Sequence, residues 1–317
     1  MAAIALDIGG TKIEGATFTP DGHIIDRHRE LIGSRTGAAV GRLASDIAAR
    51  LLQQATAENI TIANIGVCVP GIVHRSTGSV WAPNIPGWDD YPLRDELAER
   101  FAGIGVSIDS DRSCSIYGES WLGSAAGCHD AVFVAVGTGI GLGIKVDGRV
   151  LHGFGDIAGA TGWMALEPPY DHKFDQCGCF EYYASGTGIG ANARLLLDAR
   201  HRDRIIDFGG ATVISDVRAE HVFRAYDDGD PIAIQVLEKA VQMWGMGAAN
   251  IISLFNPEYL IWGGGVFGPA VRFIDDIRRE AARWAQPIAM QQVKFTAASR
   301  DINPILAGAA YIAFNHL

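Results

Sequence analysis

An acid, two glycines, a hydroxyl and a cation come directly after the first apolar run of the chain, as Asp7, Gly9, Gly10, Thr11 and Lys12. Two glycines at a tight turn let backbone amides approach an anion closely, because no Cβ stands in the way. In such a turn Lys12 can balance the charge of a phosphate, Thr11 can hydrogen-bond it, and Asp7 can hold water on a metal ion. A plain hairpin with a Gly-Gly turn explains the same residues. This stretch alone therefore leaves both interpretations open.

Two further glycine turns follow the apolar runs 131–136 and 259–262. Their candidate binding residues are Gly137, Thr138, Gly139, Gly264 and Gly265. Glycine is unhelpful at a strand end unless something must come close to the backbone. The chain has no G-x-x-x-x-G-K-[ST] segment, and its glycine spacing does not open a Rossmann helix. The pattern favours a nucleotide held between two hairpin turns.

A candidate general base follows the predicted strand 106–108. The acidic turn Asp109-Ser110-Asp111 precedes a predicted helix over residues 112–121. A carboxylate between a strand and a helix can accept a proton from an alcohol placed in line with a γ-phosphate. Capping the helix is the commoner use of such a residue. Because Asp109 and Ser110 can share the capping, we favour Asp111 as the base.

The elements around these residues repeat. A strand, a glycine turn with a threonine and a return strand occur twice, which predicts an α/β fold of two duplicated lobes facing a common cleft. We expect a small lobe from residues 1–112 plus 303–317 and a large lobe from residues 113–302. Within the large lobe we expect an irregular functional loop over 156–185 and helices over 232–255 and 270–284.

Composition narrows the class of protein. The 317 residues are 48% hydrophobic and 20% charged, with a formal net charge of −10. No Lys/Arg-rich block offsets this charge, so neither nucleic acid nor an anionic membrane is expected as a partner. We expect no signal peptide and no membrane span. Five cysteines, an odd number, predict no disulfide framework and suit the reducing cytoplasm.

The glycine segments 7–12, 137–141 and 262–265 resemble the ATP-binding segments of the ROK sugar kinases, which belong to the actin-like and hexokinase-like ATPase superfamily. Val69-Pro70-Gly71, the run 83–88 and Asp111 resemble its sugar-binding segments. The resemblance implies two actin-like (ribonuclease H-like) lobes, often in a homodimer. It also implies phosphoryl transfer from ATP with Mg²⁺ to a sugar hydroxyl, often the 6-OH, with Asp111 as base. The implied acceptor-binding residues are Pro70, Gly71, Asn84, Ser110, Asp111 and Glu181.

The chain departs from the family in the run that contacts the sugar. The family has Ala-Gly-Glu-x-Gly-His where residues 158–163 read Ala-Gly-Ala-Thr-Gly-Trp. Ser110 also stands where an asparagine is usual. The lost hydrogen-bonding groups would leave a glucose-type ring poorly satisfied near C1 and C2. Trp163 offers an apolar face on which a ring can stack, or it packs the loop.

The same departure affects a metal site. Many members hold a structural zinc through the lost histidine and a cysteine-rich run, which is shortened here to Cys177-Gly178-Cys179 with His172 nearby. Three ligands fall short of the four that structural zinc requires. We therefore expect no zinc and free thiols in an ordered loop.

The leading hypothesis is an ATP-dependent kinase of a sugar or sugar-like polyol. Glucose, fructose, mannose, an N-acetylhexosamine, a cyclitol, a deoxy sugar or a modified hexose stay open as acceptor, and polyphosphate as an alternative donor. A catalytically silent sugar sensor is the main alternative. A ROK transcriptional regulator, with a winged-helix domain ahead of the same fold, is not favoured because this chain begins at the first strand and is acidic.

Overall fold

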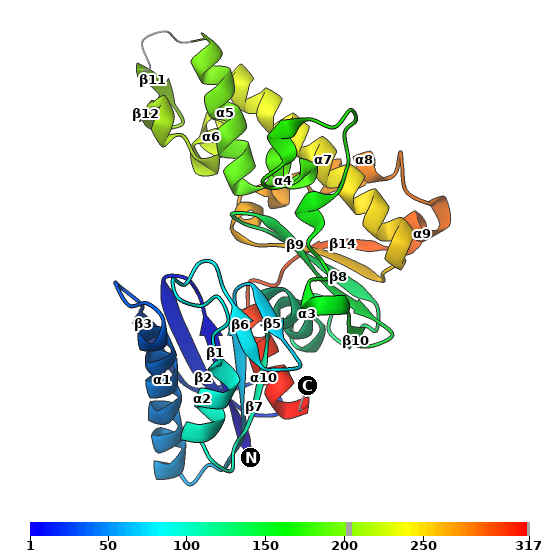
Figure 1. Ribbon diagram of the computed structural model, residues 1–317. Coiled ribbons are helices and arrows are strands. Elements are labelled where there is room, and N and C mark those ends of the chain that lie inside the picture. The colour runs from blue at the N-terminus through cyan, green and yellow to red at the C-terminus, as the bar shows by residue number, and fades with distance from the viewer. Residues whose placement is uncertain (201–204, 316–317) are drawn as a thin grey trace. The chain divides into compact units, whose positions relative to one another are not determined.

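The computed structural model describes residues 1–200 and 205–315 and divides into two compact units (Figure 1). The first unit comprises Met1–Cys128, Arg149–Ala158 and the chain from Ala298 on. The second comprises His129–Gly148 and Gly159–Ala297. The expected α/β class is confirmed.

The boundaries of the units differ from the expected ones. Residues 113–128, 149–158 and 298–302 belong to the first unit. The reason is helical packing, because α3 (Asp111–Trp121) lies against α10 (Pro304–Asn315) and cannot be cut at residue 112. Residues 316–317 of the expected small lobe lie outside the described residues.

The first unit is built on a five-stranded sheet in the order β3-β2-β1-β4-β7. The β1/β2 and β2/β3 pairs are antiparallel, whereas β4 is parallel to both β1 and β7. Its strands are β1 (Ala2–Ile8), β2 (Lys12–Phe18), β3 (Ile24–Leu31), β4 (Ile62–Val69), β5 (Ile72–His74), β6 (Ser79–Trp81), β7 (Gly105–Ser110) and β10 (Arg149–Val150). Its helices are α1 (Ala38–Ala57), α2 (Leu93–Arg100), α3 and α10.

Alternation along β1 assigns its two faces. Ile4, Leu6 and Ile8 share a core with apolar residues of α1, while α10 packs on β1 and β4 (Figure 1). Successive side chains of a strand point to opposite faces, so Asp7 lies on the face opposite Ile8. In register with Asp7 are Cys68 on β4 and, beyond it, Asp109 on β7. Polar groups are thus aligned at the ends of three parallel strands.

Close backbone packing holds α10 in place. A Cβ on Gly66 would lie 1.8 Å from the carbonyl oxygen of Ala309, and one on Gly308 would lie 1.8 Å from that of Cys114. These glycines bring α10 against both β4 and α3. The contact with α10 therefore holds the N-terminal turn of α3 in place.

The second unit repeats the same strand pattern. Its main strands follow the order β9-β8-β13-β14, with β8 and β9 antiparallel and β13 parallel to both β8 and β14. Its strands are β8 (Ala131–Val136), β9 (Ile140–Val146), β11 (Ile205–Phe208), β12 (Ala211–Val213), β13 (Tyr259–Gly263) and β14 (Lys294–Ala297). Its helices are α4 (Cys179–Ala184), α5 (Gly186–Arg200), α6 (Ala219–Asp227), α7 (Pro231–Phe255), α8 (Ile274–Ala281) and α9 (Pro287–Gln292).

Helix α7 matches its sequence signals. Asp230 caps it by accepting hydrogen bonds from the amides of Ile232 and Ala233 at 2.7 and 3.1 Å, and Pro231 occupies the first turn. Asn256 ends it in the left-handed region at φ 43°. No described helix is both long and apolar enough to span a bilayer.

The expected single helix over 270–284 was wrong. A short 3₁₀ turn, Ala270–Phe273, precedes α8, and α9 follows as a separate helix after residue 286. The expected irregular stretch 156–185 contains several 3₁₀ turns and ends in α4. Such tight turns are common at helix ends, and the apolar period of the sequence does not distinguish them from a continuous helix.

We expect Gly308→Ala to lower the free energy of unfolding by about 1–3 kcal/mol or more, because the new methyl group meets a backbone carbonyl that cannot move aside. This outcome opposes the higher helix propensity of alanine. Chemical denaturation measures the change. Gly268→Ala is the matched control, since its Cβ would lie 3.6 Å from the nearest such atom. Equal stability of both variants would show that α10 does not need the close approach.

Candidate functional site

The turn after β1 brings the predicted phosphate-binding residues next to the predicted acceptor loop. The amide of Gly9 donates to the carbonyl of Lys12 at 3.0 Å, which closes the turn. A Cβ on Gly10 would lie 3.3 Å from the Cβ of Asn84. Thr11 is held at the turn by its carbonyl, which accepts from the amide of Ile32 at 2.9 Å. The first unit therefore gathers two of the sequence-predicted segments.

Lys12 already has a partner in this unit. Its Nζ lies 3.7 Å from Oε2 of Glu14, a largely buried residue whose Oε1 lies 2.5 Å from Nε of Arg27. The charge of Lys12 is therefore partly balanced by Glu14 in this structure.

Asp7 is partly buried at the end of β1. Burial raises the pKa of its carboxyl from 3.8 to about 6, and the charges of Glu14 and Asp111 act in the same direction. Lys12 and a hydrogen bond from Asn303 oppose the rise in this pKa. A crowded carboxylate of this kind is well suited to the neighbourhood of a cation.

Asp111 is not the N-cap of its helix, although its Oδ1 accepts from the amide of Arg112 at 2.9 Å. Ser110 is the N-cap of α3, and its Oγ accepts from the amide of Ser113 at 3.3 Å. Asp111 is the first residue of the helix, and burial raises the pKa of its carboxyl while the charge of Arg112 opposes the rise. A half-buried carboxylate with a raised pKa is a stronger base than an exposed one.

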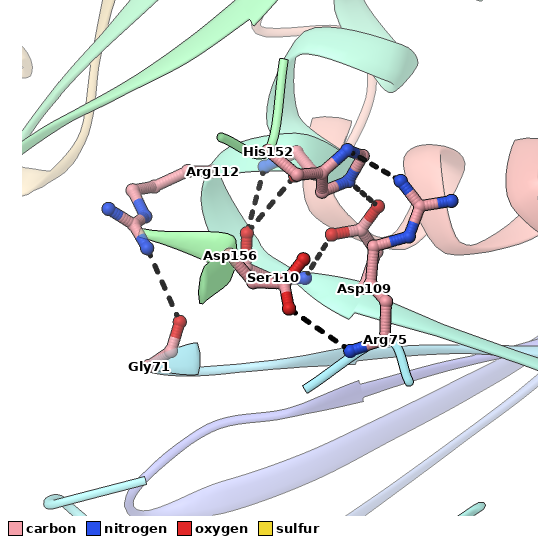
Figure 2. A network of polar contacts seen from close by, with 8 residues as sticks. Gly71, Arg75, Asp109, Ser110, Arg112, His152 and Asp156 are labelled. Atoms are coloured by element: carbon pink, nitrogen blue, oxygen red, sulfur yellow. Dashed lines mark hydrogen bonds and ion pairs between the residues drawn. The ribbon is translucent and has the colours of Figure 1, made fainter. Parts of the chain in front are cut away.

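A polar cluster beside Asp111 was not predicted from the sequence (Figure 2). Nε2 of His152 lies 2.8 Å from Oδ2 of Asp109, and its Nδ1 lies 2.7 Å from Nη1 of Arg75. Because a guanidinium only donates, Nδ1 must accept, and Nε2 carries the proton donated to Asp109. Oδ1 of Asp109 accepts from the amide of Ser110 at 2.7 Å. Arg75 is also held through its amide, which donates to Oδ2 of Asp156 at 3.2 Å. The cluster thus fixes the cap residue next to Asp111.

Pro70 and Gly71 connect β4 to β5 in the same unit. Gly71 has φ +97°, and a Cβ there would lie 2.2 Å from the carbonyl oxygen of Trp81 on β6, so glycine is required. The loop that carries Asn84 is anchored by Trp88, whose Nε1 donates to the carbonyl of Gly37 at 3.1 Å.

The second unit contains a pocket of about 940 Å³ at the end of its sheet. Gly137, Thr138 and Gly265 of the predicted turns line it. Residues that the sequence analysis missed complete the lining: Gly186, Thr187, Gly190, Arg194, Ser215, Arg218, Ala219, Glu220, Phe223, Val266 and Pro269. These come from α5, from α6 and the segment before it, and from the turn after β13, and no local motif marks them.

The remaining glycines of these turns have packing roles. A Cβ on Gly139 would lie 2.6 Å from Oε2 of Glu181, and one on Gly264, at φ +88°, would lie 2.5 Å from the carbonyl oxygen of Val136. Neither glycine is among the residues that line the pocket. The pattern in the sequence did not distinguish a glycine that faces a pocket from one that makes room for a neighbour.

Glu181 is tied to the second glycine turn. Its Oε2 accepts from the amide of Ile140 at 2.7 Å, and a Cβ on Gly162 would lie 2.7 Å from the same oxygen. Burial raises the pKa of the Glu181 carboxyl, and the Ile140 amide opposes this. Trp163, 59% exposed, lines a separate pocket of about 660 Å³ with Tyr170. Because Gly162 directly precedes Trp163, the backbone at Trp163 lies close to Glu181 within the second unit.

The segment around Cys177 and Cys179 lies wholly within the described residues. Cys179 is buried, Cys177 is partly buried and both are free thiols. His172 is exposed, with its Nδ1 3.3 Å from Oδ2 of Asp175. Over residues 1–200 and 205–315, no group of three His, Cys, Asp or Glu residues is arranged to hold a metal ion.

The raised pKa of Asp7 has a measurable effect on stability. Between the unfolded value near 3.8 and the folded value of about 6, the folded state holds a proton that the unfolded state has lost. Stability from this group is therefore present at low pH and is lost as pH rises through 6. In Asp7→Asn, measured by denaturation without divalent cations, we expect a gain over wild type of about 2 kcal/mol at pH 7 relative to pH 4. A pH-independent difference between Asp7→Asn and wild type would contradict the assignment.

Comparisons of the sequence and the structure with those of known proteins identify related proteins. The ROK family matches residues 3–316. A glucokinase from Halalkalibacterium halodurans is 29% identical over 303 residues, 93% of this chain and 90% of that protein. A solved ROK family glucokinase from Streptomyces griseus, in complex with glucose and AMPPNP, aligns with a TM-score of 0.76 and 27% identity over 99% of this chain and 100% of that one.

Relatives with another role also occur. A xylose repressor from Caldicellulosiruptor bescii is 28% identical over 228 residues, which are 70% of this chain and 55% of that protein. The relatives of this chain therefore include a regulator as well as enzymes. Since the family matches nearly the whole length, the chain belongs to the ROK family, whose solved sugar kinases share its actin-like α/β fold.

Proposed function

We propose that the protein is an ATP-dependent kinase that phosphorylates a hydroxyl, of the 6-OH type, on a sugar or sugar-like polyol. The observation that carries the proposal is the state of Asp111, a half-buried carboxylate whose helix is capped by Ser110 instead. The named glucokinases among the relatives support a carbohydrate kinase at the coarser level.

The pocket of the second unit is proposed to bind the nucleotide. Its volume suits a nucleotide, Gly137 and Gly265 allow close approach to the backbone, and Arg194 and Arg218 supply positive charge. Phe223 offers an apolar surface for a base. These features favour ATP over polyphosphate, which has no base to bind.

Asp7 is the residue proposed to serve Mg²⁺. Its pKa is raised by burial and by two neighbouring carboxyls, so a cation nearby relieves the repulsion. Mg²⁺ retains several waters and needs few protein ligands, which fits a single carboxylate that holds the ion through water. When bound, the ion neutralises phosphate charge during transfer.

In the proposed reaction, the ionised Asp111 accepts the proton of the acceptor hydroxyl as that oxygen attacks the γ-phosphorus. Burial raises the pKa of Asp111, and the charge of Arg112 acts against this rise in the direction that favours the ionised form. Gly71, Asn84 and Glu181 are proposed to position the ring, and Trp163 to provide a stacking face. A cyclitol or modified hexose fits the departure at residues 158–163 as well as an ordinary hexose does.

The second candidate function is a catalytically silent sugar sensor, which the missing glutamate and histidine of the run 158–163 favour. A panel of hexoses, amino sugars and cyclitols, assayed for ADP release and separately for binding, tests both. Tight binding of a sugar without turnover of any acceptor would overturn the kinase proposal and support the sensor.

Asp111→Asn should lower kcat by about 10²–10⁴-fold, because the amide cannot accept the proton, while the acceptor still binds. Steady-state kinetics with a coupled ADP assay measures the change. Asp46→Asn removes an exposed carboxylate from α1 and serves as the control. An Asp111→Asn enzyme with wild-type kcat would exclude Asp111 as the base.

Side chains at position 265 should obstruct the nucleotide in proportion to their size. Gly265 has no positive φ and no neighbour within 4 Å of a new Cβ, so substitution there extends into open space. We expect the Kd of ATP to rise from Gly265→Ala to Gly265→Leu with little change in the melting temperature. Calorimetric titration checks this; unchanged ATP affinity in Gly265→Leu would place the nucleotide elsewhere.

A further inference from the structure

Arg112 is a charged residue of the first unit whose position is not fully explained by the motifs or by the proposed reaction. It is the second residue of α3, directly after Asp111. Its Nη2 donates to the carbonyl of Gly71 at 3.5 Å (Figure 2). Its Nη1 donates to the carbonyl of Ala158, also at 3.5 Å. The guanidinium therefore lies between the segment of Gly71 and the start of the run 158–163, both of which were predicted to contact the acceptor.

The hydrogen-bonding capacity of this guanidinium is largely unused. Arginine has five N–H donors in a planar fork, and Arg112 employs two of them in bonds at the outer limit of length. Among the described residues, no carboxylate forms an ion pair with it within 4.0 Å. Asp111 is close enough to feel its charge, but that carboxylate is the proposed base.

The other acids beside Arg112 are already engaged. Asp109 is bound by His152 and by the amide of Ser110, and Asp156 by the amide of Arg75. Arg112 also lies in the first turn of a helix, where the backbone dipole favours negative charge and disfavours a cation. A half-buried guanidinium in this position is stabilised by an anion that completes its fork.

We propose that Arg112 binds an anionic substituent of the acceptor, so that the preferred substrate is an acidic sugar or acidic cyclitol carrying a carboxylate, sulfate or phosphate. This inference rests on the proposed kinase function and specifies its substrate class. The run 158–163 contains no carboxylate that would repel such a group. The two carbonyls that hold the guanidinium belong to acceptor segments, which favours this role over contact with the transferred phosphate.

The test uses pairs of acceptors that differ by one anionic group: gluconate and glucitol, glucuronate and glucose, and N-acetylmuramate and N-acetylglucosamine. Binding to the full-length protein is measured by calorimetry without nucleotide, and kcat/KM by ADP release. The variants are Arg112→Met, which keeps the stem without the charge, and Arg112→Lys, which keeps the charge without the fork. Arg35→Met is the matched control, since Arg35 also donates to two carbonyls, of Leu31 and Ile32, but is exposed.

In wild type and Arg35→Met we expect the anionic member of at least one pair to bind about tenfold or more tightly than its neutral partner. Arg112→Met should bring the ratio close to one, and Arg112→Lys should restore part of it. A wild-type preference for the neutral member of every pair would overturn the inference. So would an Arg112→Met enzyme that loses kcat equally with both members and keeps their binding ratio, which would assign Arg112 to the phosphate.

The two proposals fail in different ways. If acidic acceptors bind through Arg112 but no ADP is released with any acceptor, the kinase function fails and the anion site stands. If neutral sugars are phosphorylated and acidic ones neither bind nor react, the kinase stands and the anion site fails.

Discussion

Carboxylates gathered at the ends of parallel strands are the constraint on which the first unit depends. The register of β1, β4 and β7 places Asp7 and Asp109 in one row across the sheet, and Asp111 follows at the start of α3. Burial raises the pKa values of Asp7 and Asp111, and the charges of Glu14 and Asp111 raise that of Asp7 further. The three acids differ in their partners: Asp109 accepts a hydrogen bond from the neutral imidazole of His152, Asp111 accepts one from the amide of Arg112, and Asp7 is hydrogen-bonded to Asn303.

The hydrophobic core and the site are connected through α10. Gly66 and Gly308 allow this helix to contact β4 and α3 backbone to backbone, which fixes the N-terminal turn of α3. Asn303, just before α10, accepts from the amides of Ile305 and Leu306 at 3.2 Å and also hydrogen-bonds Asp7. The residue that caps the last helix therefore also orients the first acid of the chain.

The second unit uses glycine for two distinct purposes. Gly137 and Gly265 line the pocket, whereas Gly139 provides the space in which Glu181 reaches the amide of Ile140. Gly264 makes room for the carbonyl oxygen of Val136 at the end of β8. The same residue type at similar positions after a strand thus lines a pocket in one case and allows close approach of the protein's own atoms in another.

Local signals in the sequence were sufficient to predict the α/β class, the repeated strand and glycine turn, and the bounds of α7. They also identified Asp111 as a candidate base. These features follow from the apolar period, caps and turn residues, which lie close together in the chain. The tertiary structure decided that Ser110 caps α3, that Lys12 is paired with Glu14, and that α3 belongs to the first unit. It alone brought His152 to Asp109 and placed Arg112 between the carbonyls of Gly71 and Ala158. These contacts join residues about 40 to 50 positions apart, and no local periodicity or motif encodes such pairs.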